Sequence, residues 1–169
     1  LRNSSAASDV YKRQAKIIAA TRAAGKMVVV DPKLADFKAY AGASLLTPNL
    51  SEFRKTGALA GDALEDIAKA ASGLATSHGM DAILVTLSAR GMLLARADGS
   101  WHHAPAQARE VFDVSGAGDT VIAMLAAALA GGVEMEHAVT LANMAASVVV
   151  GKSGTCLLYT SPSPRDLRK

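Results

Sequence analysis

Apolar runs alternate with helix-forming segments along most of the chain. Residues 27–30, 43–47 and 82–86 are apolar without regular polar alternation. Because strands that are buried on both faces read as unbroken aliphatic runs, each is predicted to be an interior strand. Segments rich in helix formers cover residues 15–25, 62–78, 118–130 and 135–150. This alternation is typical of crossover units around a parallel sheet with helices on both faces.

Turn and capping residues mark the boundaries of these elements. Gly25 suits the left-handed position after a helix. Asp62, followed by Glu65 three residues later, resembles a capping box and predicts the start of a helix. Asp98-Gly99 lies between extended segments and predicts a β-hairpin over residues 92–104. The expected fold class is therefore α/β, a three-layer α-β-α arrangement with a mainly parallel sheet and one hairpin.

The two ends of the chain differ from the middle. Residues 4–14 and 156–166 show no helix or strand period. Back-translated, both resemble a transposase-type adapter of sequencing libraries, and their DNA versions contain the reverse complements TGTATAAGAGACAG and CTGTCTCTTATACA. Residues 1–14 and 156–169 are therefore expected to be non-native, with the native segment at 15–155.

The charge changes once the ends are set apart. The 169 residues carry a net charge of +3 and a pI near 9.1, which would favour nucleic acid or an anionic membrane as a partner. Six of the 18 Lys and Arg residues and two of the 15 Asp and Glu residues lie in the ends, so residues 15–155 carry about −1. With no membrane-length apolar run and no leader-like start, we expect a cytoplasmic protein that binds neither nucleic acid nor membrane.

The segment 112–120, Phe-Asp-Val-Ser-Gly-Ala-Gly-Asp-Thr, carries the clearest chemistry. Its small residues let the backbone approach a ligand at the start of a helix, where the N–H groups of Gly116, Ala117 and Gly118 can hold an anion. Asp119 beside such a site fits a general base that takes a proton from a hydroxyl during phosphoryl transfer. The alternative is a tight turn in which Asp119 only complements the helix dipole.

Three motifs resemble those of the ribokinase-like, or PfkB, sugar kinases. They are residues 113–120, the Asn-x-x-Glu pattern at 49–52, and the Thr-x-Gly-x-x-Gly loop at 86–91, in which Ser88 stands where glycine is commoner. The resemblance implies ATP and a sugar phosphate as substrates, Asp119 as the catalytic base, and residues 116–118 as the anion hole. It also implies Mg²⁺ bound through water by Glu52, and nucleotide contacts from Asn49, Leu50, Ser51, Glu52, Thr86, Gly91 and Asn143.

Several of these residues have a purely structural alternative. Asn49 and Glu52 can serve as an N-cap and a first-turn acid. Asn143 can make a polar contact between helices. Lys33 can meet a phosphate or lie in solvent, and the sequence does not decide. Lys152 lies in a loop that by resemblance is near the nucleotide or a monovalent-cation site; otherwise it complements the dipole at the end of a helix. His102 and His103 lack further ligands at metal-binding spacing, so packing is favoured over zinc.

A closer resemblance, over residues 30–53, 111–122 and 148–155, is to kinase domains of the bifunctional heptose-7-phosphate kinase/heptose-1-phosphate adenylyltransferases. It implies phosphorylation of the anomeric hydroxyl of D-glycero-beta-D-manno-heptose 7-phosphate, a step toward ADP-heptose and the lipopolysaccharide core. It also implies a monovalent cation near residues 151–154 and a homodimer in the full-length enzyme. Residues 15–155 would then be the C-terminal nucleotide-binding part of the kinase domain. The alternatives are another sugar kinase, such as a ribokinase or fructokinase, and an inactive nucleotide-binding fragment.

Overall fold

A five-stranded mixed sheet organises the molecule. The computed structural model describes residues 4–107 and 116–151. Within them the strands lie in the order β1-β2-β3-β4-β5. Strands β1, β2 and β3 pair in parallel, whereas β4 is antiparallel to both β3 and β5. Four of the five strands therefore point the same way, and β4–β5 is the predicted hairpin. The bounds are Val29–Val30 for β1, Leu45–Leu46 for β2, Ala82–Thr86 for β3, Met92–Arg96 for β4 and Trp101–Ala104 for β5.

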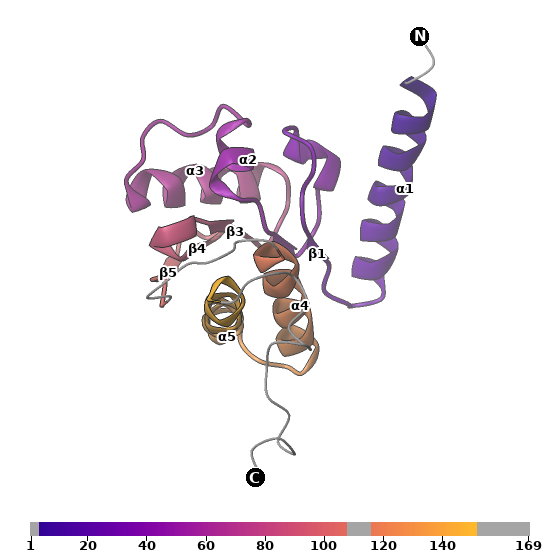
Figure 1. Ribbon diagram of the computed structural model, residues 1–169. Coiled ribbons are helices and arrows are strands. Elements are labelled where there is room, and N and C mark those ends of the chain that lie inside the picture. The colour runs from indigo at the N-terminus through magenta and orange to yellow at the C-terminus, as the bar shows by residue number, and fades with distance from the viewer. Residues whose placement is uncertain (1–3, 108–115, 152–169) are drawn as a thin grey trace.

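Helices cover both faces of this sheet, as Figure 1 shows. One face carries α2 and α3, and the other carries α4 and α5, so the expected three-layer α-β-α arrangement is confirmed. The helices are α1 (Ser4–Ala23), α2 (Leu50–Arg54), α3 (Leu64–Ser77), α4 (Ala117–Ala130) and α5 (Met135–Val150), with short 3₁₀ turns η1 (Phe37–Tyr40) and η2 (Ser88–Arg90). No helix in the described part of the chain is long and apolar enough to cross a membrane.

The central strand β3 explains the unbroken apolar run. Ile83 and Val85 belong to the core beneath α3, while Leu84 belongs to the core beneath α4 and α5. All three are fully buried. Because successive side chains of a strand point to opposite faces, a strand between two helical layers needs apolar residues at every position.

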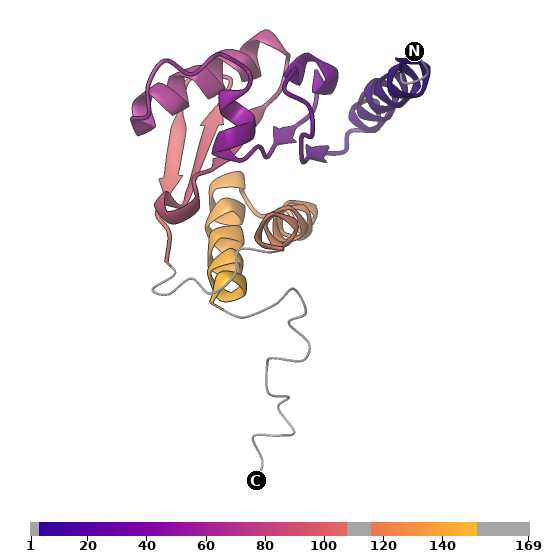
Figure 2. The same ribbon diagram turned by 45° about the horizontal axis from the view of Figure 1, so that its top comes forward.

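Helix α1 is longer than the sequence pattern predicts. The expected helix begins at residue 15, whereas α1 begins at Ser4 and runs through residues 4–14. Alanine, lysine, arginine and glutamine are good helix formers, so local propensity continues the helix without an amphipathic period. Figures 1 and 2 show α1 beside the body of the molecule. Its buried side chain Ile18 joins the core on the α3 face.

The end of α1 matches its prediction. Gly25 has φ of 69° and donates its N–H to the carbonyl of Arg22, while Lys26 donates to that of Thr21. These two bonds form a Schellman motif, which satisfies carbonyls that the helix leaves unpaired. The motif turns the chain from α1 into β1.

The start of α3 differs from its prediction. Its N-cap is Ala63, which makes no side-chain capping bond, so the capping box expected from Asp62 and Glu65 is wrong. Instead, the Asp62 carboxylate accepts two hydrogen bonds from the Arg54 guanidinium, at 2.7 and 2.8 Å. That partner holds the pKa of Asp62 below its usual range. The pair is exposed and connects the end of α2 to the chain just before α3.

Candidate active site

A cavity of about 210 Å³ lies where the ends of the parallel strands meet the start of α4. Its lining residues come from the segments that follow β1 and β2, from the end of β3 and from the first turns of α4. Open α/β sheets bind ligands at the carboxyl ends of their strands. The lining consists of Asp31, Lys33, Thr47, Asn49, Glu52, Thr86, Gly116, Gly118, Asp119 and Val121. Six of the eleven site residues named from the sequence therefore meet here.

The start of α4 supplies backbone donors to this cavity. Gly116 is the N-cap, has φ of 76° and makes no side-chain capping bond. The intrahelical bonds of α4 begin with Thr120, whose N–H reaches the Gly116 carbonyl at 3.0 Å. The amides of the preceding turn therefore have no acceptor within the helix. Such amides, at the positive end of the helix dipole, suit an anion.

Asp119 lies in the first turn of α4 and lines the same cavity. Asp119 is exposed, so its carboxylate is accessible to a substrate hydroxyl. A carboxylate at this end of a helix is also stabilised by the dipole, as the structural alternative requires. Its position on the cavity wall agrees with both interpretations, because one carboxylate can complement the dipole and accept a proton.

Asn49 and Glu52 form a complete capping box at the start of α2. The Glu52 N–H donates to Asn49 Oδ1 and the Asn49 N–H donates to Glu52 Oε2, both at 2.9 Å. This confirms the N-cap interpretation of the two residues. It does not remove them from the cavity, which both line. Thr86 N–H donates to the Pro48 carbonyl at 3.0 Å, which connects the start of α2 to the end of β3.

The oxygen-rich lining fits a hydrated magnesium ion. Asp31, Glu52 and Asp119 bring three carboxylates to the cavity, and Thr47 and Thr86 bring hydroxyls. Oxygen donors of this kind suit Mg²⁺. The described residues contain no cluster of three His, Cys, Asp or Glu side chains arranged to hold a metal. The donor set therefore fits an ion that is shared with phosphates and water, which is how Mg²⁺ is commonly held, and not an all-protein cage.

Asp31 and Lys33 join the site at the end of β1. Lys33 Nζ lies 2.5 Å from Asp31 Oδ2. This hydrogen bond is the main cause that raises the pKa of Lys33; burial opposes it, and the charges of Asp31, Glu52 and Asp119 add to it. Asp31 and Thr47 were not among the sequence-predicted residues. The available signal was their place directly after β1 and β2, at the ligand-binding edge of a parallel sheet.

Gly91 and Asn143 do not line this cavity. Both lie next to the chain that follows β5. A Cβ at Gly91 would lie 2.1 Å from the Ala104 carbonyl oxygen, and its φ of 88° also favours glycine. Asn143 is buried, and its Nδ2 donates to the Pro105 carbonyl at 2.7 Å. Asn143 therefore contacts a loop and not a second helix. Both residues lie against the segment 104–106, Gly91 by close approach and Asn143 through a hydrogen bond.

The remaining named residues have varied positions. Leu50 packs against the core on the α3 face, and Ser51 is exposed on α2. Ala117 is the first residue of α4, next to the cavity-lining Gly116 and Gly118. Residues 113–115 of the signature and 152–154 of the expected cation loop lie outside the described residues.

Ser88 is the position at which the 86–91 loop departs from the family pattern, and its backbone conformation is unusual. It is the one non-glycine residue with a positive φ, 54°, among residues 4–107 and 116–151. Side chains other than glycine rarely adopt this conformation. The backbone at this position therefore favours the glycine that the pattern usually has.

Comparison with known proteins agrees with the fold and the motifs. A bifunctional protein HldE from Paramagnetospirillum magneticum is 54% identical over 144 residues, which are 85% of this chain and 30% of that protein. One from Pseudomonas fluorescens is 51% identical over 160 residues, 94% of this chain and 33% of that protein. The chain thus spans about a third of the length of these relatives.

Solved structures show the same fold. Ribokinase from Arabidopsis thaliana, complexed with ribose and ATP, matches with a TM-score of 0.77 at 23% identity, covering 93% of this chain and 51% of that one. Phosphofructokinase-2 from Escherichia coli, in complex with potassium, matches with a TM-score of 0.75 at 21% identity, covering 86% of this chain and 48% of that one. The expected ribokinase-like fold is therefore confirmed.

A family model decides the broader assignment. The model described as pfkB family carbohydrate kinase matches residues 8–162. The match extends into both end segments that resemble adapter sequence, by residues 8–14 and 156–162. It covers most of the chain, and the motifs that suggested the family lie within it. The chain belongs to the pfkB family of carbohydrate kinases.

Proposed function

We propose that residues 15–155 are the C-terminal, nucleotide-binding part of an ATP-dependent sugar kinase domain, with phosphoryl transfer at the cavity before α4. One observation carries the proposal: Asp119 and the first amides of α4 line the same cavity as Asn49 and Glu52. The cavity volume of about 210 Å³ is below that of ordinary ligand pockets. It therefore suits the phosphate end of ATP and not the whole nucleotide.

The proposed reaction is an in-line transfer. Asp119 accepts the proton of the sugar hydroxyl while that oxygen forms a bond to the γ-phosphorus of ATP. The bond from this phosphorus to the β,γ-bridging oxygen breaks, and ADP leaves with the electron pair. The amides of Gly116, Ala117 and Gly118 stabilise the negative charge on the transferred group. The proposed base and the amides that hold the charge both lie at the start of α4.

Glu52 and Asn49 have a second role in this proposal. Glu52 uses Oε2 in the capping box, so Oε1 is the oxygen that would hold a magnesium-bound water. When bound, Mg²⁺ neutralises charge on the phosphates. Asn49 fixes the orientation of the Glu52 backbone through its Oδ1. A monovalent cation near residues 151–154 remains part of the proposal.

We further propose a heptose 7-phosphate as the sugar, phosphorylated at its anomeric hydroxyl. Two observations support this choice: the likeness of residues 30–53 to heptose-phosphate kinases, and the identity of 54% and 51% to relatives named bifunctional protein HldE. The product would be a heptose 1,7-bisphosphate, on the route to ADP-heptose. An ATP-dependent reaction of this kind belongs in the cytoplasm, and we propose a homodimer for the full-length enzyme.

The test uses a hybrid kinase, in which residues 15–155 replace the matching segment of the Paramagnetospirillum magneticum relative. ADP release is measured with heptose 7-phosphate, ribose and fructose, with the unaltered relative alongside. Because the rest of the kinase domain comes from the relative, the hybrid tests whether residues 15–155 complete a heptose 7-phosphate kinase. We expect its kcat/KM for heptose 7-phosphate to stay within about tenfold of that of the unaltered relative. Preferred use of ribose or fructose would contradict the heptose assignment and leave the kinase assignment standing, and loss of turnover with all three sugars would contradict the kinase assignment.

The isolated chain needs a separate proposal, because it covers only about half of the ribokinase and phosphofructokinase-2 chains that share its fold. We propose that it binds nucleotide without transferring phosphate. Calorimetric titration with MgADP and the ADP-release assay with heptose 7-phosphate separate the possibilities. Binding without turnover is expected, and turnover by the isolated chain would contradict this part of the proposal.

A further inference from the structure

Lys33 is the only positively charged side chain on the cavity wall as the described residues define it. The same wall carries the carboxylates of Asp31, Glu52 and Asp119. A phosphate that enters therefore meets three negative side chains and one positive one. Because like charges within a few ångströms repel, the single ammonium has a large influence on whether an anion can bind.

The backbone of Lys33 is anchored in the core, whereas its side chain is exposed. The Tyr40 hydroxyl, from η1, accepts the N–H of Lys33 at 2.9 Å and that of Leu34 at 3.2 Å. Tyr40 is 2% exposed, so this anchor is part of the core. The Lys33 side chain is 74% exposed. The ammonium thus starts from a fixed point at the cavity and can move to a second partner.

The present partner of Lys33 is one that a phosphate can replace. Asp31 lies only two residues before Lys33, in the same segment after β1, and its carboxylate accepts the hydrogen bond of the Lys33 ammonium. A phosphoryl group at the α4 amides would carry more negative charge than a single carboxylate. A lysine ammonium is a compact point charge with three donors, so it can exchange one oxygen partner for another without a demanding geometry.

We propose that Lys33 leaves Asp31 and binds the phosphoryl group that is transferred, as a substrate-contacting residue of the site. The inference rests on the proposed kinase function and deepens it. The chemistry recognised is a terminal phosphate that faces both Lys33 and the first amides of α4. This group is the γ-phosphate, which a nucleoside triphosphate carries and a nucleoside diphosphate lacks.

The test compares two nucleotides on the complete 169-residue chain. Calorimetry measures the Kd of the β,γ-imido analogue of ATP and of ADP, each with Mg²⁺, for the unaltered chain and for Lys33→Met. A charge-assisted hydrogen bond to the terminal phosphate predicts that Lys33→Met raises the Kd of the analogue about tenfold and that of ADP by less than about twofold. Lys33→Arg is expected to recover most of the affinity for the analogue.

Lys38→Met is the matched control, since Lys38 is an exposed lysine of η1 that does not line the cavity. It removes the same charge and should change neither Kd by more than about twofold. If Lys33→Met raised the Kd of both nucleotides equally, or if Lys38→Met raised the Kd of the analogue as much as Lys33→Met does, the inference for Lys33 would be overturned. The proposed nucleotide site would stand in either case. Failure of the unaltered chain to bind either nucleotide would overturn both this inference and the proposed nucleotide site.

The sugar substrate carries a phosphate of its own, so a second arm separates the two sources. In the hybrid kinase, a contact with the transferred group predicts that Lys33→Met lowers kcat at least tenfold and leaves the KM for heptose 7-phosphate within about twofold. A raised KM for the sugar phosphate with unchanged kcat would assign Lys33 to the sugar's phosphate and overturn the proposal.

Discussion

Ser88 occupies a backbone position that favours glycine. Its φ of 54° places an L side chain in the left-handed region, at a cost of about 1 kcal/mol. Glycine removes this cost but loses more backbone entropy on folding, so the two effects partly offset. We expect Ser88→Gly to raise the free energy of unfolding by about 0.5 kcal/mol, measured by urea denaturation. A decrease of more than about 1 kcal/mol would show that the Ser88 side chain makes a stabilising contact.

The capping box at α2 gives a second prediction for a single residue. Asn49→Ala removes the acceptor for the Glu52 N–H, and loss of an N-cap costs about 1 kcal/mol of unfolding free energy. Asn49→Asp keeps the acceptor and is the control, with an expected change below about 0.5 kcal/mol. Equal losses in the two variants, measured by urea denaturation, would show that the cap does not stabilise α2.

Individual residues show how far local patterns carry. Asn49 and Glu52 are recognisable both as a helix cap and as a kinase motif, and the two interpretations are compatible because the cap uses Asn49 Oδ1 and Glu52 Oε2, whereas Asn49 Nδ2 and Glu52 Oε1 take no part in it. Asp62 has the same local pattern, yet its carboxylate pairs with Arg54 instead of capping α3. The local sequence does not contain the position of Arg54, so this outcome depended on tertiary structure.

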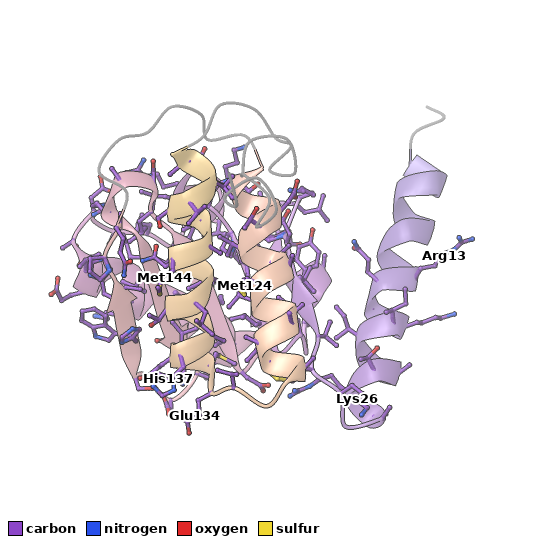
Figure 3. All side chains as sticks on the ribbon, turned by 60° about the horizontal axis from the view of Figure 1, so that its bottom comes forward. Arg13, Lys26, Met124, Glu134, His137 and Met144 are labelled. Atoms are coloured by element: carbon purple, nitrogen blue, oxygen red, sulfur yellow. The ribbon has the colours of Figure 1, made fainter. Side chains whose placement is uncertain are left out.

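Among the elements, helix α4 joins the core to the site. Leu125 is fully buried in the core against the sheet, whereas Met124, next to it in sequence, is 36% exposed. Figure 3 shows α4 and α5 side by side, with Met124 of α4 labelled. Through its Leu125 face α4 packs on the sheet, and this packing positions the first turn of α4 at the cavity.

This arrangement predicts different costs for two neighbouring truncations. Leu125→Ala leaves a cavity in the core and is expected to lower the free energy of unfolding by about 2–5 kcal/mol. Met124→Ala, the control on the exposed side, is expected to cost less than about 1 kcal/mol. Urea denaturation of both variants gives the comparison. Similar costs at the two positions would mean that α4 does not pack on the sheet through its Leu125 face.

The elements were largely predictable, and the exceptions have physical causes. The apolar run at 82–86 matches β3 because every position of an interior strand is buried. The runs at 27–30 and 43–47 give only two-residue strands, since paired backbone and not apolar composition defines a strand. The helix over residues 4–14 follows from residue propensity, which has no periodic signature.

At the scale of the whole molecule, sequence motifs that are far apart meet at one edge of the sheet. Asn49 follows β2, Thr86 ends β3 and Asp119 lies in the first turn of α4, and all three line one cavity. Topology alone also places Asp31 at this edge. Gly91, from the 86–91 motif, and Asn143, from α5, were also expected at the nucleotide site, but they lie against the chain after β5. That placement depends on the path of a loop, which residue patterns do not specify.

The most direct test of the central claim is Asp119→Asn in the hybrid kinase. The amide keeps the shape of the side chain but cannot accept the proton of the sugar hydroxyl. We expect kcat for phosphoryl transfer to heptose 7-phosphate to fall by about 10²–10⁴, while the Kd of MgATP stays within about twofold. Turnover at the unaltered rate would contradict the assignment of Asp119 as the base.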